Sequence, residues 1–79
     1  MGVDLQAIDL HKIDLSNALM SKANLANAKL CRANLTGADL SYANLNSADL
    51  HRANLRHANL KGADLRKADL RGLICGAQT

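Results

Sequence analysis

The chain has 79 residues, of which 48% are hydrophobic and 22% are charged, and its formal net charge is +3. A chain of this length forms one small domain, 1–79, that buries roughly 60% of its unfolded surface. It contains no apolar run near the roughly 18 residues of a membrane span, and no targeting segment is expected. We therefore expect a soluble, cytoplasmic protein.

A leucine recurs at every fifth residue from Leu5 to Leu70. An alanine usually stands two residues before it, an Asp or Asn stands one residue before it, and the two positions after it are variable and mostly polar. The departures in chain order are Val3, Ile8 and Ile13 at the alanine position, Leu19 and Lys29 at the Asp/Asn position, Met20 at the leucine position, and Leu73 and Ile74 near the end.

A period of five residues fits neither regular helix nor regular strand. A helix would rotate successive leucines by roughly 140°, and a strand would place them alternately on opposite faces. If the chain bends once in each repeat, every leucine and alanine can point into a polygonal coil. Such coils stack about 4.7–4.9 Å apart and form a solenoid. The spacing leaves open whether three or four repeats close one coil.

The stretch Ala33–Leu40 and its copies resemble the pentapeptide-repeat family, whose pattern is a small residue, Asp or Asn, Leu or Phe, a polar residue and often Gly. The resemblance covers residues 3–75. It implies an all-β fold, a right-handed quadrilateral β-helix with twenty residues per coil and about four coils. Gly occupies the last repeat position only at Gly37, Gly62 and Gly72, and we expect this departure to change the turn types at the corners. Because no Phe is present, we expect an all-aliphatic core.

The ends of a solenoid expose unpaired edges. We expect Val3, Ile8 and Ile13 to plug the first coil, while Leu73 and Ile74 make the last one unusually apolar. An end-to-end homodimer through Leu73 and Ile74 is favoured over a monomer or a fragment of a longer solenoid.

Two cysteines are present. We expect Cys31, which follows a leucine, to face solvent and Cys75, at a leucine position, to face inward. With twenty residues per coil they lie on different faces and two coils apart, which is beyond the roughly 7 Å limit for a disulfide. Two free thiols are typical of a reducing compartment.

Basic side chains gather at outward positions. Residues 1–40 hold four cations and four anions, whereas residues 41–79 hold six cations and three anions. The candidate face for binding an anion or a partner consists of Lys12, Arg32, Arg52, Arg56 and Arg71. Alternatively, Asp9, Asp49 and Asp69 on the same side neutralise this charge, and the face is only solvated.

His11, Cys31 and His51 fall in one column and have the chemistry of metal ligands. Three ligands on a flat face beside Lys12, Arg32 and Arg52 are a weak indication, so we expect ordinary surface residues, with no metal site and no cofactor. Catalysis needs a nucleophile and a base that converge in a cleft. The repeated Asp and Asn residues are expected to form corner and ladder hydrogen bonds, and we predict that the protein is not an enzyme.

The sequence therefore favours a non-catalytic structural or protein-interaction module whose partner is another protein. The resemblance also implies an alternative, because some members of the family mimic DNA and bind gyrase. That role requires an acidic surface and is disfavoured by the positive net charge. A further alternative is anion or nucleic-acid binding through the basic face, although Tyr42 is the only aromatic residue available for base stacking.

Overall fold

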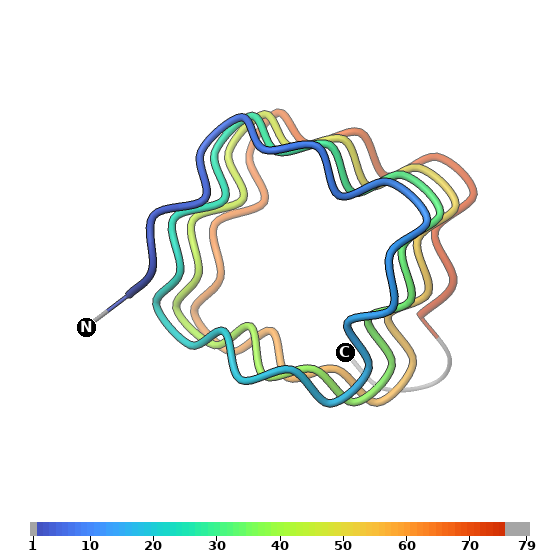
Figure 1. Ribbon diagram of the computed structural model, residues 1–79, viewed down its shortest axis with the longest axis horizontal. Coiled ribbons are helices and arrows are strands. Elements are labelled where there is room, and N and C mark those ends of the chain that lie inside the picture. The colour runs from blue at the N-terminus through green and yellow to red at the C-terminus, as the bar shows by residue number, and fades with distance from the viewer. Residues whose placement is uncertain (1, 76–79) are drawn as a thin grey trace.

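The computed structural model describes residues 2–75, which coil around a four-sided core (Figure 1). Within this range the chain forms isolated parallel β-bridges rather than longer strands or helices. Each bridge joins residues that lie twenty positions apart, from Asp4↔Asn24 to Asn54↔Ile74. One coil therefore takes twenty residues, or four repeats, which settles the alternative that the spacing left open.

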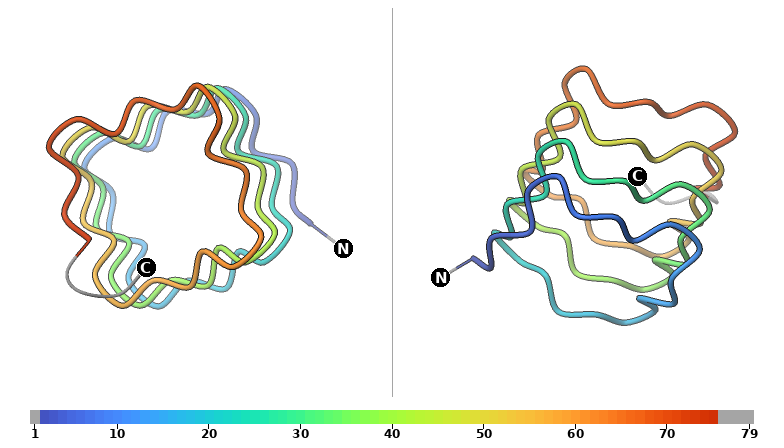
Figure 2. Two further views of the ribbon diagram at one scale, coloured as in Figure 1. Left: turned by 180° about the vertical axis from the view of Figure 1, so that it is seen from behind. Right: turned by 45° about the horizontal axis from the view of Figure 1, so that its top comes forward.

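Successive coils stack in register, as the tilted view shows (Figure 2). Backbone hydrogen bonds join each coil to the next, with donors on both sides of the junction. The Leu25 amide donates to the carbonyl of Asn44 in the next coil at 2.7 Å, and the Asn44 amide donates back to the carbonyl of Ala23 at 2.9 Å. This pattern repeats along the sides, so each coil is bound to the next mainly through its backbone.

Each corner is a tight turn that follows a leucine. The Leu35 carbonyl accepts a hydrogen bond from the Ala38 amide at 3.0 Å, and the same bond recurs at other corners. The second corner residue has a positive φ, which is typical of a type II turn. Eleven residues other than glycine adopt this conformation with φ between 56° and 64°, and three glycines have φ between 66° and 70°. The expectation that the scarcity of glycine changes the turn type was wrong, because the ladder holds polar residues in the same conformation.

The three corner glycines make room for a side chain in the preceding coil. A Cβ on Gly62 would lie 2.5 Å from Cδ1 of Tyr42, and one on Gly37 would lie 2.4 Å from Oδ1 of Asn17. A side chain at this position therefore leans toward the next coil. Glycine occurs at the corners where the side chain of the preceding coil leaves no room for a Cβ.

The core is aliphatic. Its centre consists of the leucines and alanines from Ala23 to Leu55, each at most 2% exposed. The prediction that bulky residues plug the first coil holds for Ile8, which packs against the core, whereas Val3 is 52% exposed and Ile13 is 37% exposed. The first coil has only one neighbouring coil to pack against, so its side chains are less buried than those of the central coils. At the other end, Leu73 is partly buried against the core.

The Asp and Asn residues before each leucine cap the corners. Their Oδ1 atoms accept a hydrogen bond from the amide two residues later. The Thr36 amide donates to Asn34 at 3.1 Å, and the Ser41 amide donates to Asp39 at 3.0 Å. The same bond forms at every Asp or Asn in this position from Asp4 to Asp69. These side chains have the hydrogen-bonding role that the sequence predicts for them.

Candidate functional site

One corner collects most of the predicted basic face. The amide of Lys12 donates to the carbonyl of Cys31 at 3.0 Å, that of Arg32 to His51 at 3.0 Å, and that of Arg52 to Arg71 at 2.8 Å. We call this corner, residues 11–12, 31–32, 51–52 and 71–72, the basic corner. It contains four of the five residues of the predicted binding face, stacked one above another.

Arg56, the fifth residue of that face, lies at the next corner. Its carbonyl accepts a hydrogen bond from the Gly37 amide at 2.8 Å. The predicted face is therefore divided between two corners. Lys61 and Lys67 lie at the remaining two corners. The Lys61 carbonyl accepts a hydrogen bond from the Tyr42 amide, and the carbonyl of Arg66, next to Lys67, accepts one from the Ser47 amide. The C-terminal coil thus carries a cation at each of its four corners.

Two of the C-terminal cations are held by carboxylates. Nε and Nη2 of Arg71 donate to Oδ1 and Oδ2 of Asp69 at 2.9 and 2.7 Å, and Arg66 makes the same pair with Asp64. These side-chain bonds, together with the amide bonds of the two arginines, lower the pKa of Asp64 and Asp69 to about 2. Within residues 2–75, no ion pair engages Arg52, Arg56, Lys61 or Lys67.

A hollow of about 460 Å³ opens at the basic corner, lined by His51, Arg52, Arg71 and Gly72. It exists because Gly72 has no side chain above Arg52, whose Cγ would lie 3.1 Å from a Cβ placed there. The hollow is open to solvent, and Arg52 is the basic residue of its lining that no carboxylate within residues 2–75 holds. Its chemistry suits an anionic group such as a carboxylate of another protein.

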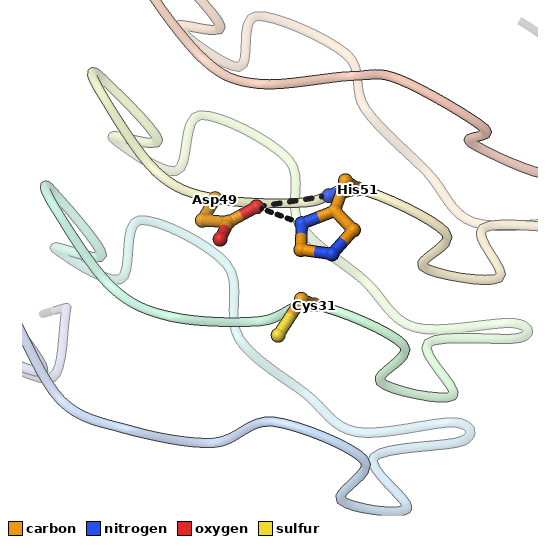
Figure 3. Close-up of side chains that lie close together, drawn as sticks. All are labelled: Cys31, Asp49 and His51. Carbon is orange, nitrogen blue, oxygen red and sulfur yellow. Dashed lines mark hydrogen bonds and ion pairs between the residues drawn. The ribbon is translucent and has the colours of Figure 1, made fainter.

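Beside the hollow, Cys31, Asp49 and His51 form a compact group (Figure 3). A sulfur, a carboxylate oxygen and a ring nitrogen lie within 4.8 Å of one another. The Nδ1 atom of His51 lies 2.6 Å from Oδ1 of Asp49. The sequence places His11, Cys31 and His51 in one column, but the structure brings Asp49 into the group, whereas His11 pairs with Asp9 at 2.7 Å.

Sequence reasoning missed Asp49 as a member of this group, because it assigned Asp49 to corner hydrogen bonding and to neutralising the basic face. The signal was present, since an Asp two residues before a His occurs at both Asp9 and Asp49. An Asp at this spacing caps the corner amide and can also reach the His ring. Cys31 is only partly exposed rather than open to solvent. Cys75 is also partly buried, and both cysteines are free thiols, as predicted.

The predicted assembly residues, Leu73 and Ile74, both lie in the last coil of residues 2–75. Leu73 packs partly against the core, whereas Ile74 takes the Asp/Asn position and is 38% exposed on a side of the solenoid. Its amide and carbonyl both bond to the preceding coil, to Ala53 and Leu55. In the part of the chain that the structure describes, no helix is long and apolar enough to cross a membrane.

Solved structures of similar proteins share this fold. Rfr23, a pentapeptide repeat protein of the cyanobacterium Cyanothece 51142, matches with a TM-score of 0.73 and 31% identity over 94% of this chain and 57% of its own. The protein alr5209 of Nostoc PCC 7120 matches with a TM-score of 0.68 and 42% identity over 85% and 60% of the two chains. HetL of Nostoc, a pentapeptide repeat protein involved in heterocyst differentiation regulation, matches with a TM-score of 0.53 and 40% identity over 96% and 42%.

The chain therefore spans between two fifths and three fifths of the length of these relatives. No curated protein matches it. The likeness to solved pentapeptide repeat proteins supports a right-handed quadrilateral β-helix, and such proteins are structural repeat modules. The sequence model for pentapeptide repeats matches residues 1–37 and 33–72 with eight copies. The repeat, the twenty-residue coil and these matches together show that the chain belongs to the pentapeptide-repeat family.

Proposed function

We propose that this protein is a non-catalytic interaction module that binds an acidic surface of another protein. The observation that carries the proposal is a set of cations in the C-terminal half of the chain. Arg52, Arg56 and Lys61 lie at three different corners and have no carboxylate partner within residues 2–75. The fold does not need these charges, because the leucine core and the ladder hold the coil.

An acidic protein fits this surface better than a small anion does. The cations are spread around the coil rather than converging on one point, and electrostatic attraction between extended surfaces guides association and orientation. The hollow at the basic corner offers one local position for a carboxylate. Mimicry of DNA would require the opposite sign of charge, and the chain carries a net +3.

The test compares two charge-reversal variants that change the net charge equally. One variant carries Arg52→Glu and Arg56→Glu, and the matched control carries Lys22→Glu and Lys29→Glu, which lie outside the predicted binding face. Fluorescence anisotropy measures binding to labelled polyglutamate and to labelled duplex DNA at about 50 and 200 mM salt. We expect polyglutamate binding to weaken at least about tenfold more in the first variant than in the control.

Equal losses in both variants would mean that only net charge matters, and the proposal would be wrong. Tighter binding of DNA than of polyglutamate through Arg52 and Arg56, with a steep salt dependence, would replace the acidic protein by nucleic acid as the partner. Circular dichroism of both variants checks that the fold is retained.

We also propose that copies of the chain associate end to end, with Leu73 and Ile74 contributing to the contact. Size-exclusion chromatography with light scattering, on the wild type and on a Leu73→Lys, Ile74→Lys variant, tests this. Assembly in the wild type that the variant abolishes supports the proposal. A monomeric wild type would refute it.

A further inference from the structure

We infer that Cys31, Asp49 and His51 form a binding site for a thiophilic divalent cation, with Zn²⁺ as the ligand that its donors fit. The sulfur, a carboxylate oxygen and a ring nitrogen lie within 4.8 Å of one another. Zinc bonds to these atoms are about 2.0–2.3 Å long, so tetrahedral ligands are about 3.3–3.8 Å apart. Side-chain rotations at a partly exposed surface supply the remaining movement.

The fold places the three groups together through two different features. Cys31 and His51 follow a leucine in adjacent coils, and the backbone of Arg32 bonds to His51, so the two side chains stack. Asp49 comes two residues before His51 and bends back to cap its amide at 3.2 Å. In Figure 3 the Cys31 sulfur lies below the His51 imidazole and the Asp49 carboxylate.

The His51 ring is already oriented. The contact holds Nδ1 of His51 and Oδ1 of Asp49 only 2.6 Å apart. An ion on Nε2 could not reach a carboxylate that accepts from Nδ1 of the same ring, so the ion takes Nδ1 and one oxygen of Asp49 and displaces the proton between them. Oδ2 of Asp49 accepts no hydrogen bond within residues 2–75.

The donor set and the surrounding charge select the kind of cation. Lys29 occupies the position next to Asp49 in the preceding coil, and Arg71 lies in the next coil, although Asp69 holds its guanidinium. These charges disfavour a hard cation that is bound by charge alone. A thiolate favours Zn²⁺, Co²⁺ or Cd²⁺ over Mg²⁺ and Ca²⁺, which prefer oxygen ligands. Three protein ligands leave a fourth position for water.

The chain supplies a matched control for each ligand. Cys75 is a second free thiol, and His57 is a histidine at another corner. Asp9 makes the same kind of pair with His11, two coils before His51. Cys31→Ser, Asp49→Asn and His51→Gln remove the proposed ligands. Cys75→Ser, Asp9→Asn and His57→Gln leave them in place.

The experiment titrates the reduced full-length protein with Co²⁺ and follows the thiolate-to-cobalt charge-transfer absorption, with Zn²⁺ as competitor. We expect one ion per chain, displacement by Zn²⁺ but not by excess Mg²⁺, and at least about tenfold weaker binding in each ligand variant. The three controls should bind like the wild type. Thermal unfolding without metal confirms that the ligand variants fold.

Absence of the charge-transfer band in the wild type would overturn the inference, as would equal weakening by Cys75→Ser or Asp9→Asn. These outcomes do not test whether the protein binds an acidic partner, because neither Arg52 nor Arg56 is altered. Failure of the metal site therefore leaves the proposed interaction module unaffected.

Discussion

Leu19 is the position at which a single substitution should stabilise the fold. It stands where the repeat usually has Asp or Asn, and its side chain is 89% exposed. The amide of Ser21, two residues later, has no acceptor within residues 2–75, whereas the equivalent amides at Ser16 and Ser41 are capped at 3.0 Å. Leu19→Asn supplies the missing oxygen and removes exposed apolar surface.

The expected gain is about 0.5–1 kcal/mol. A net hydrogen bond is worth about 0.5–1.5 kcal/mol. Complete burial of a leucine is worth about 1.5–3 kcal/mol, so the small buried fraction of Leu19 accounts for about 0.2–0.3 kcal/mol of lost packing. Asn is better than Asp here because Asp39 lies directly opposite in the next coil, and adjacent like charges are destabilising.

Thermal unfolding measured by circular dichroism tests this prediction, with Leu19→Ala as the control that removes the leucine without adding an acceptor. For a domain of this size we expect the melting temperature of Leu19→Asn to rise by about 2–8 °C. Leu19→Ala should stay within about 2 °C of the wild type. An Asn variant no more stable than the Ala variant would refute the capping argument.

Other substitutions probe the core, the corners and the acid response. Leu40→Ala, at a fully buried position, should lower the free energy of unfolding in urea by about 2–5 kcal/mol. Leu70→Ala, at 39% exposure, should lower it by less than about 2 kcal/mol. Equal costs would contradict a core that is more tightly buried at its centre than at its end. Gly62→Ala should cost about 1–2 kcal/mol of stability because Gly62 has a positive φ, and it should displace Tyr42. The fluorescence of Tyr42, the only aromatic residue of the sequence, is the readout. An unchanged signal would argue against the contact. The pKa of Asp69 is about 2 when folded, below its ordinary 3.8, so its contribution to stability is present above about pH 4 and lost as the pH falls toward 2. Asp69→Asn should flatten the loss of stability over that range, and an unchanged acid profile would show that the pair with Arg71 does not contribute.

The fold could be predicted because its determinants are repeated. Leucine at a period of five excludes helix and strand, so Leu25, Leu45 and their equivalents can be buried only if the chain bends once per repeat. The stacking of residues such as Arg32 and Arg52 then follows from the length of the coil. The free state of Cys31 and Cys75 follows from the same register.

The turn type and the metal ligands could not be read from the pattern. Glycine at a corner appeared to decide the turn, yet residues such as Lys12 adopt the same positive φ because the ladder fixes the backbone around them. Asp9 and Asp49 both precede a histidine by two residues, so the sequence does not separate them. Asp49 is distinguished by the position of Cys31 beside its pair with His51, which depends on the rotamers of all three residues.

The directional ladder determines how copies of this chain can add to one another. In the interior, Leu25 donates forward along the stack, while the amide and carbonyl of Asn24 both bond backward. Parallel pairing that continues this ladder would join the leading edge of a last coil to the trailing edge of a first coil. Such pairing would be heterologous, without a two-fold axis, and would continue into a filament whose length rises with protein concentration. Two copies of the same edge could instead pair antiparallel about a two-fold axis, which would close the assembly as a dimer.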